Sequence, residues 1–151
     1  MPLNFRTATS ADLPFIVRLI HEDSVVPSGE DMDDPAGQPY AAALAAIDAD
    51  PNQAVYIAER DGEPVGTYQL SFVPGIARRG MWRGLVEAVH VAPGHRSKGY
   101  GAEMMAHAIA LCRSRGCGMV QLTSNKARVD AHRFYRRLGF AQSHEGFKLY
   151  L

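Results

Sequence analysis

The sequence predicts a single mixed α/β domain on three observations. An Asp-Gly pair at residues 61–62 separates two strand-like runs, residues 54–60 and 63–72. This is the strongest short-range signal for a β-hairpin, because a type I′ turn needs positive φ at both central residues. A valine-rich run over residues 82–91 leads through a glycine-containing loop into a helical pattern, and residues 131–138 repeat apolar side chains at helical spacing. A chain of 151 residues suits one domain with a sizeable core.

The N-terminal third predicts a strand, two helices and an acidic loop between the helices. Residues 3–8 alternate apolar and polar side chains, and residues 13–20 fill one broad helical face after Ser10, a candidate N-cap. Residues 40–47 form a second, alanine-rich helical pattern. The loop between the helices is either a solvated connection or a surface that attracts a cationic acceptor. Its carboxylates are Glu22, Asp23, Glu30, Asp31, Asp33 and Asp34.

The remaining elements are predicted from the spacing of their apolar residues and from the glycines at which the helices end. Their expected positions are a helix over residues 104–112 that stops at Gly116, a strand over residues 119–123, the helix over residues 131–138 that stops at Gly139, and strands over residues 140–143 and 147–151.

Composition excludes several classes of protein. Sixteen basic and sixteen acidic residues balance, so no global field favours nucleic acid or an anionic membrane. The two cysteines, Cys112 and Cys117, match no zinc-binding pattern, and we expect no metal site. Neither a signal-peptide core nor an apolar run approaching 18 residues occurs, and we expect a cytoplasmic protein.

The loop after the valine-rich run has the properties of a phosphate-binding cradle. It contains basic residues and two glycines, Gly99 and Gly101, directly before a helix, where unpaired N–H groups and the helix dipole favour an anion. A nucleotide P-loop is excluded, because Tyr100 and Gly101 stand where Lys-Ser/Thr is required. A dinucleotide fingerprint is excluded too, because Met104 replaces its third glycine and no acidic residue lies near Val120.

Two motifs carry a resemblance to a known family. Arg96-x-x-Gly99-x-Gly101 resembles the pyrophosphate-binding loop of the GNAT superfamily of N-acetyltransferases. Asn125, Ala131-x-x-Phe134-Tyr135 and Leu138-Gly139-Phe140 resemble the second signature of that superfamily, which lines the acetyl-CoA groove. The resemblance covers residues 54–151 well and the N-terminal third only in outline. Ser97 is a departure, since many members carry glycine there.

The resemblance implies an α/β (α+β) fold in a single N-acetyltransferase domain over residues 1–151. Its central sheet would be mixed, mostly antiparallel, with about six to seven strands flanked by about four helices and a parallel V-shaped splay between the fourth and fifth strands. It also implies acetyl-CoA as cosubstrate, with the pantetheine arm in the splay. The residues expected to contact it are Val89, His90, Val91, Arg96, Ser97, Lys98, Gly99, Tyr100, Gly101, Asn125, Ala131 and Phe134.

Acetyl transfer to an amine also needs a proton acceptor and a proton donor. Tyr135 is the candidate acid for the departing thiolate, and Glu87 is the first candidate base, acting through a water. His90 titrates near neutral pH and competes as a base, but strand alternation places it on the face opposite Glu87, Val89 and Val91. The third alternative is that a water accepts the proton without help from either side chain.

These features favour an enzyme that transfers acetyl from acetyl-CoA to a primary amine of a small molecule or peptide by direct attack. The alternative is a non-catalytic module that binds or senses acyl-CoA. Nucleic-acid binding is less favoured, because the arginines concerned occupy more than one side of an otherwise apolar helix; they are Arg128, Arg133, Arg136 and Arg137. The sequence does not identify the acceptor amine or the oligomeric state, although homodimers are common among proteins that it resembles.

Overall fold

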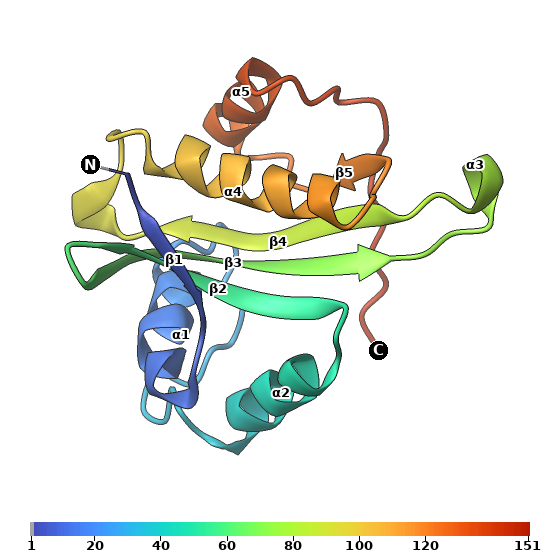
Figure 1. The fold of residues 1–151 in the computed structure, drawn as a ribbon. Helices are drawn as coiled ribbons and strands as arrows, with labels where there is room; N and C mark the ends of the chain where they lie inside the picture. The colour runs from blue at the N-terminus through green and yellow to red at the C-terminus, as the bar shows by residue number, and fades with distance from the viewer. Residues whose placement is uncertain (1) are drawn as a thin grey trace.

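The computed structural model describes residues 2–151, which form one five-stranded sheet between two layers of helices (Figure 1). The strands stand in the order β1-β2-β3-β4-β5. The first four pair antiparallel and β5 pairs parallel with β4, so the sheet is mixed as predicted. Their bounds are β1 Asn4–Thr7, β2 Gln53–Arg60, β3 Glu63–Val73, β4 Arg83–Val91 and β5 Met119–Gln121.

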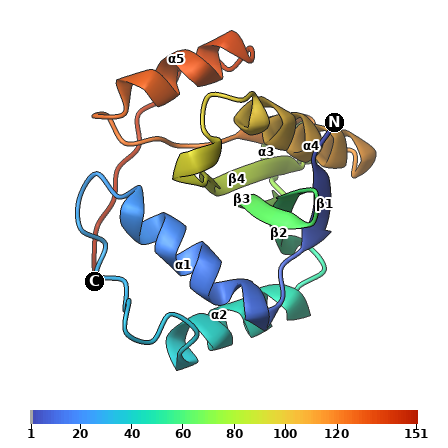
Figure 2. The same cartoon turned by 90° about the vertical axis from the view of Figure 1, so that its left-hand side faces the viewer.

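Helices α1 and α2 cover one face of the sheet, and α4 and α5 cover the other, as Figures 1 and 2 show from two directions. A single turn, α3, lies in the connection between β3 and β4, and short 3-10 turns precede α1 and α4. The helix bounds are α1 Leu13–Glu22, α2 Gln38–Ala49, α3 Ala77–Gly80, α4 Tyr100–Ser114 and α5 Val129–Arg137.

Local sequence signals account for the N-terminal elements and the hairpin. Asp61 and Gly62 both have positive φ, 53° and 82°, which confirms the tight turn between β2 and β3. The first helical turn begins after Thr9 rather than Ser10, because Asp12 reaches back to the backbone N–H of Thr9 at 2.7 Å. Asp12 also pairs with the Arg6 guanidinium at 2.7 Å, which ties this turn to β1.

The main core lies between the sheet and α4. Tyr68 from β3 and Val86 from β4 meet Met104 and Met105 from α4, and all four are 1% exposed or less. At Gly84 the strand and the helix are so close that an added Cβ would lie 2.2 Å from Sγ of Cys112. A second cluster, which includes Leu13, Leu44 and Ile57, packs α1 and α2 against the other face. Helix α4, whose N-terminus forms the cradle, is therefore held against β4.

The expected number of strands is too high. Residues 140–143 and 147–151 form no strand, so the sheet has five strands rather than six or seven. Alternating apolar residues make a segment compatible with a strand, but a strand forms only where a neighbour supplies hydrogen bonds. Within the described chain, residues 141–151 make no backbone–backbone hydrogen bond.

Among the described residues, no helix combines the length and the apolar character that crossing a membrane would require.

Candidate active site

The centre of the site is the gap that opens where β4 and β5 diverge. The two strands pair only from Arg83 with Met119 to Leu85 with Gln121. Beyond Leu85, β4 continues as far as Val91 and pairs only with β3, while the chain after β5 turns away toward α5. The edge of β4 that faces this gap therefore carries backbone groups with no partner from β5, and the V-shaped splay is confirmed.

A β-bulge in β4 sets the direction of the side chains at the gap. Gln69 of β3 pairs with Glu87 and Thr67 pairs with His90, so a single β3 residue spans both Ala88 and Val89. Ala88 has φ of 51°, in the left-handed region. The extra residue changes the phase of the alternation along the strand.

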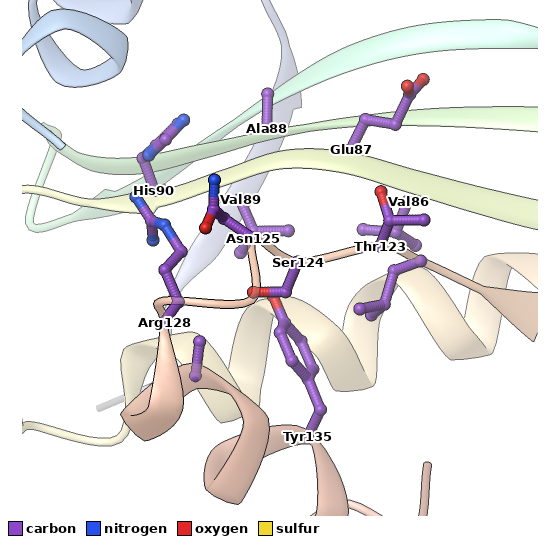
Figure 3. Close-up of a pocket in the computed structure, with 12 residues that line it drawn as sticks. Val86, Glu87, Ala88, Val89, His90, Thr123, Ser124, Asn125, Arg128 and Tyr135 are labelled. Atoms are coloured by element: carbon purple, nitrogen blue, oxygen red, sulfur yellow. The ribbon is translucent and has the colours of Figure 1, made fainter. Parts of the chain in front are cut away.

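The expected separation of Glu87 and His90 is therefore wrong. Val86 and Val89 pack toward the core under α4, whereas Glu87, Ala88 and His90 point to the other side of the strand (Figure 3). Simple alternation over residues 87–91 fails because the bulge inserts one residue between the two titratable side chains. Both candidate bases face the same side.

A pocket of about 190 Å³ occupies the gap. One wall is β4 and the other is the segment after β5 together with α5 (Figure 3). Its lining includes six residues expected from the sequence, namely Glu87, Val89, His90, Asn125, Ala131 and Tyr135. It further includes Val86, Ala88, Leu122, Thr123, Ser124 and Arg128, which the sequence did not single out as site residues.

Tyr135 enters the pocket from α5. Its ring packs against Phe134 and Phe140, with ring centroids 5.1 Å and 5.8 Å away, and Figure 3 shows it pointing up from the helix toward the gap. Burial raises the pKa of Tyr135 above its usual value near 10. No described protein group hydrogen-bonds its hydroxyl, so the phenol keeps its proton and can donate it to a bound molecule.

Asp23, the residue directly after α1, connects the pocket to the opposite helical layer. Its carboxylate lies 2.8 Å from Nδ1 of His90 and 3.1 Å from Nη2 of Arg128. The backbone carbonyl of Asp23 also accepts a hydrogen bond from Arg128. Burial acts to raise the pKa of Asp23, but the hydrogen bonds from His90 and Arg128 bring it below its usual value.

His90 is neutral in this arrangement. Burial is the largest influence and lowers the pKa of His90, while the hydrogen bond to Asp23 opposes that shift and Arg128 and Arg96 add to it. A neutral imidazole beside an ionised carboxylate places its proton on Nδ1, so Nε2 is left as the acceptor. His90 is thus a second possible base on the side where Glu87 lies.

Backbone geometry at the start of α4 fits the expected cradle. Gly99 caps the helix with φ of 82°, and the first backbone N–H with a helical partner is that of Glu103, bonded to the carbonyl of Gly99 at 3.2 Å. The N–H groups of Tyr100, Gly101 and Ala102 therefore precede the first intrahelical bond. Such a helix terminus favours an anion.

The side chains around the cradle differ in their contacts with the rest of the protein. Ser97 has φ of 62°, which explains why glycine suits this position, and both Ser97 and Lys98 are exposed. Arg96 is exposed too, but Nε donates to the carbonyl of Val91 at 3.1 Å and Nη2 lies 3.5 Å from Asp23. Arg96 therefore links the cradle to the end of β4 in addition to carrying charge.

Phe134 packs α5 against this cradle, and Asn125 shapes the turn that precedes α5. A Cβ at Gly101 would meet the Phe134 ring at 3.3 Å, so α4 and α5 approach closely there. The Asn125 side-chain oxygen accepts the N–H of Ala127 at 2.9 Å, and its carbonyl accepts that of Arg128 at 3.0 Å. Asn125 thereby forms the turn that directs Arg128 toward Asp23.

The carboxylates of the acidic loop have different surroundings. Asp23 contacts the site, whereas Glu30 accepts from the hydroxyl of Tyr40 at 3.0 Å and Asp31 accepts backbone N–H groups of Asp33 and Asp34 at 3.1 Å each. These contacts fold the loop at the start of α2. The special role of Asp23 had no signal in the sequence, because it depends on two partners 67 and 105 residues away.

Residues 16–140 match the Acetyltransferase (GNAT) family. The chain belongs to this family. It is 34% identical over 110 residues to an aminoalkylphosphonate N-acetyltransferase of Salmonella typhimurium, covering 73% of this chain and 71% of the relative. The crystal structure of a transcriptional regulator from Bacillus halodurans C-125 superposes with a TM-score of 0.93 at 35% identity, covering 99% of both chains.

A further crystal structure, that of a predicted acetyltransferase with acetyl-CoA from Clostridium acetobutylicum, has a TM-score of 0.70 at 19% identity, and the match covers 98% of this chain and 96% of that chain. At this identity the likeness concerns the fold alone. Of the two sequence motifs of the GNAT resemblance, the second reaches the pocket in the β4–β5 gap through Asn125, Ala131 and Tyr135, whereas the first lies at the start of α4 and none of residues 96–101 lines this pocket.

Proposed function

We propose that this GNAT protein transfers an acetyl group from acetyl-CoA to a primary amine of a small molecule or peptide. The observation that carries the proposal is the pocket between the splayed strands, which joins Glu87 and His90 on one wall with the free hydroxyl of Tyr135 on the other. A proton acceptor and a proton donor on opposite walls suit an amine that loses a proton and a thiolate that gains one.

The fit of acetyl-CoA rests on two features of the backbone. The left-handed Gly99 and the open N–H groups at the start of α4 would hold the pyrophosphate, with Lys98 and Arg96 nearby. The edge of β4 at Val89 and Val91, which β5 does not cover, would pair with the amides of the pantetheine arm. Phe134 and Ala131 would then line the α5 side of the same groove.

Acetyl-CoA would supply an activated thioester, and the protein side chains would manage the protons. Glu87 would accept the proton of the amine through a water, so that the nitrogen attacks as a neutral nucleophile. Tyr135 would give its proton to the departing sulfur, since its raised pKa keeps the phenol protonated at neutral pH. His90, held in one tautomer by Asp23, is the alternative proton acceptor.

The acceptor is proposed as a small-molecule or peptide amine. The Salmonella relative is named for a small amine, an aminoalkylphosphonate, and the similarity covers 73% of this chain. Specificity in such a fold is set by the parts that border the acceptor side of the gap, here α1, Asp23 and the loop that follows it.

An acceptor screen that monitors CoA release tests the proposal. The panel should contain aminoalkylphosphonates, amino sugars, polyamines, amino acids and peptides, each with acetyl-CoA and the full chain. We expect turnover with at least one amine, and we expect that turnover to disappear when acetyl-CoA is replaced by CoA. Tight acetyl-CoA binding by calorimetry without turnover on any amine would instead favour the non-catalytic sensing module, and absence of binding would contradict both.

A further inference from the structure

The C-terminal end of α4 brings the two cysteines of the chain together. Gly116, just after the helix, has φ of 76° and donates its N–H to the carbonyl of Arg113 at 3.1 Å. The N–H of Cys117 donates to the carbonyl of Cys112 at 2.9 Å. These two bonds form a Schellman motif, in which the residue after the left-handed glycine packs its side chain on the last turn of the helix. Here both positions of that contact are cysteines.

The thiols of Cys112 and Cys117 are neighbours of unequal exposure. Both are free, Cys112 is 2% exposed within the main core, and Cys117 is half-buried and packs against that core. Burial raises the pKa of the Cys112 thiol to about 11, and the charge and hydrogen bonding of the adjacent Cys117 add to the rise. Cys117 is therefore the thiol that a solute can reach, and Cys112 is the partner behind it.

The chain on both sides of this turn is fixed to the rest of the domain. Before the turn, the Arg115 guanidinium donates to the side-chain oxygen of Asn52 at 2.7 Å, and its Cζ lies 4.3 Å from the centroid of the Phe72 ring. After the turn, the N–H of Gly118 donates to the carbonyl of Trp82 at 2.8 Å. The fold thus holds the two thiols side by side, because the backbone entropy of bringing them together is already lost on folding.

We propose that Cys112 and Cys117 form a reversible disulfide in the folded protein, and that this turn is a redox modification site for low-molecular-weight disulfides. The Cys117 thiolate would attack one sulfur of such a disulfide, forming a mixed disulfide and releasing one small thiolate. The Cys112 thiolate would then attack the Cys117 sulfur and release the second. The protein thiols lose two electrons and two protons in total, and the small disulfide gains them and leaves as two thiols.

Oxidation would change the packing where β4 and β5 begin to pair. The Cys112 sulfur lies so close to Gly84 that the strand has no room for a Cβ there, and Gly84 pairs with Val120 of β5. A bond to Cys117 would draw this sulfur toward the start of β5. Neither cysteine lines the pocket, and the inference does not depend on the proposed acetyl transfer.

Mass spectrometry after treatment of the folded chain with oxidised glutathione tests the proposal. Trypsin cleaves after Arg113 and Arg115, between the two cysteines, so the disulfide should join peptides 99–113 and 116–126. Alkylation should label both thiols before the treatment and neither after it, and excess reductant should restore both. Two single variants serve as controls: Cys112→Ala should keep a glutathione on Cys117, and Cys117→Ala should gain none.

The equilibrium between dithiol and disulfide separates a site built by the fold from two cysteines that are close only in sequence. In a fixed glutathione buffer, the ratio of disulfide to dithiol should be about tenfold or more higher in the folded protein than in the same chain unfolded in urea. Equal ratios would show that the turn does not align the sulfurs and would overturn the proposal. Thiols that stay reduced in the folded protein, or a mixed disulfide on Cys117 that never closes, would overturn it as well.

Discussion

Asp23 and His90 meet across 67 positions of sequence, with the Asp23 carboxylate accepting the Nδ1–H of His90 at 2.8 Å. This contact joins the end of α1 to the bulged part of β4, and Arg128 completes it from the turn before α5. One carboxylate thereby fixes three elements around the pocket, and it also determines which nitrogen of His90 can accept a proton.

Asp23→Asn should lower the pKa of His90 still further. The hydrogen bond to Asp23 and the charge of Asp23 act to raise that pKa against the effect of burial, while Arg128 and Arg96 act to lower it. NMR titration of the His90 ring should show the shift. Asp130→Asn, which removes an exposed carboxylate that pairs with Arg133 at 3.2 Å, is the control and should leave His90 unchanged.

The same variant should lose more stability in acid than the parent. A histidine with a lowered pKa stays neutral in the folded state, while the unfolded chain takes up a proton near its ordinary value, about 6.5. The contribution of His90 to folding stability is therefore fully present above that pH, and it is lost as the pH falls toward the pKa of His90 in the folded state. The difference in unfolding free energy between parent and Asp23→Asn should widen from pH 8 to pH 5; a constant difference would contradict the assigned charge states.

Tyr135→Phe should lower kcat by about 10²–10⁴-fold with little change in acetyl-CoA affinity, since the ring and its packing remain while the proton donor is lost. Single-turnover measurements are needed, because CoA release could otherwise mask the chemical step. Tyr56→Phe, a half-buried tyrosine on β2 outside the pocket, is the matched control. A near-parental rate in Tyr135→Phe would make this residue a packing element.

A comparison of two single variants, Glu87→Gln and His90→Gln, should identify the base. If Glu87 accepts the amine proton, its replacement should reduce kcat/KM for the acceptor by about 10²-fold or more and His90→Gln should do so less. Both residues face the same side of β4, so the comparison is direct. Glu63→Gln, exposed at the start of β3, controls for charge, and a small loss in both site variants would leave water as the base.

Gly99→Ala should weaken acetyl-CoA binding, whereas Gly94→Ala in the same loop should not. Gly99 needs φ of 82°, which a Cβ disfavours even though no neighbour lies within 4 Å, while Gly94 has neither restriction. Calorimetry should show at least a tenfold difference between the two variants. Gly101→Val is a poorer test, because its Cβ would meet the Phe134 ring at 3.3 Å and disturb the fold.

Gly84→Ala should destabilise the domain by about 1–3 kcal/mol through overpacking, because the new Cβ would lie 2.2 Å from the Cys112 sulfur. The double variant with Cys112→Ala should recover most of that loss by removing the sulfur. Thermal or denaturant unfolding measures both, and additive losses in the double variant would show that the two residues do not interact.

Much of this protein could be predicted where neighbouring residues alone fix the backbone. The Asp61-Gly62 turn, the glycine cradle before α4 and the helical face with Phe134 and Tyr135 depend on residues a few positions apart. Local sterics, capping and the 3.6-residue period are sufficient for these. The family resemblance then implied that the cradle and Tyr135 belong to one site; in the structure Tyr135 lines the gap between β4 and β5, and the cradle approaches α5 where Gly101 meets Phe134.

Tertiary structure alone decided the direction of Glu87 and His90, the role of Asp23 and the absence of the last two expected strands. The bulge at Ala88 reverses the side-chain alternation that the sequence implies, because two residues of β4 stand opposite a single residue of β3. Asp23 acquires its role from partners supplied by β4 and the turn before α5. Residues 147–151 have the alternation of a strand, but a strand exists only where another backbone completes its hydrogen bonds, and that condition lies outside the segment itself.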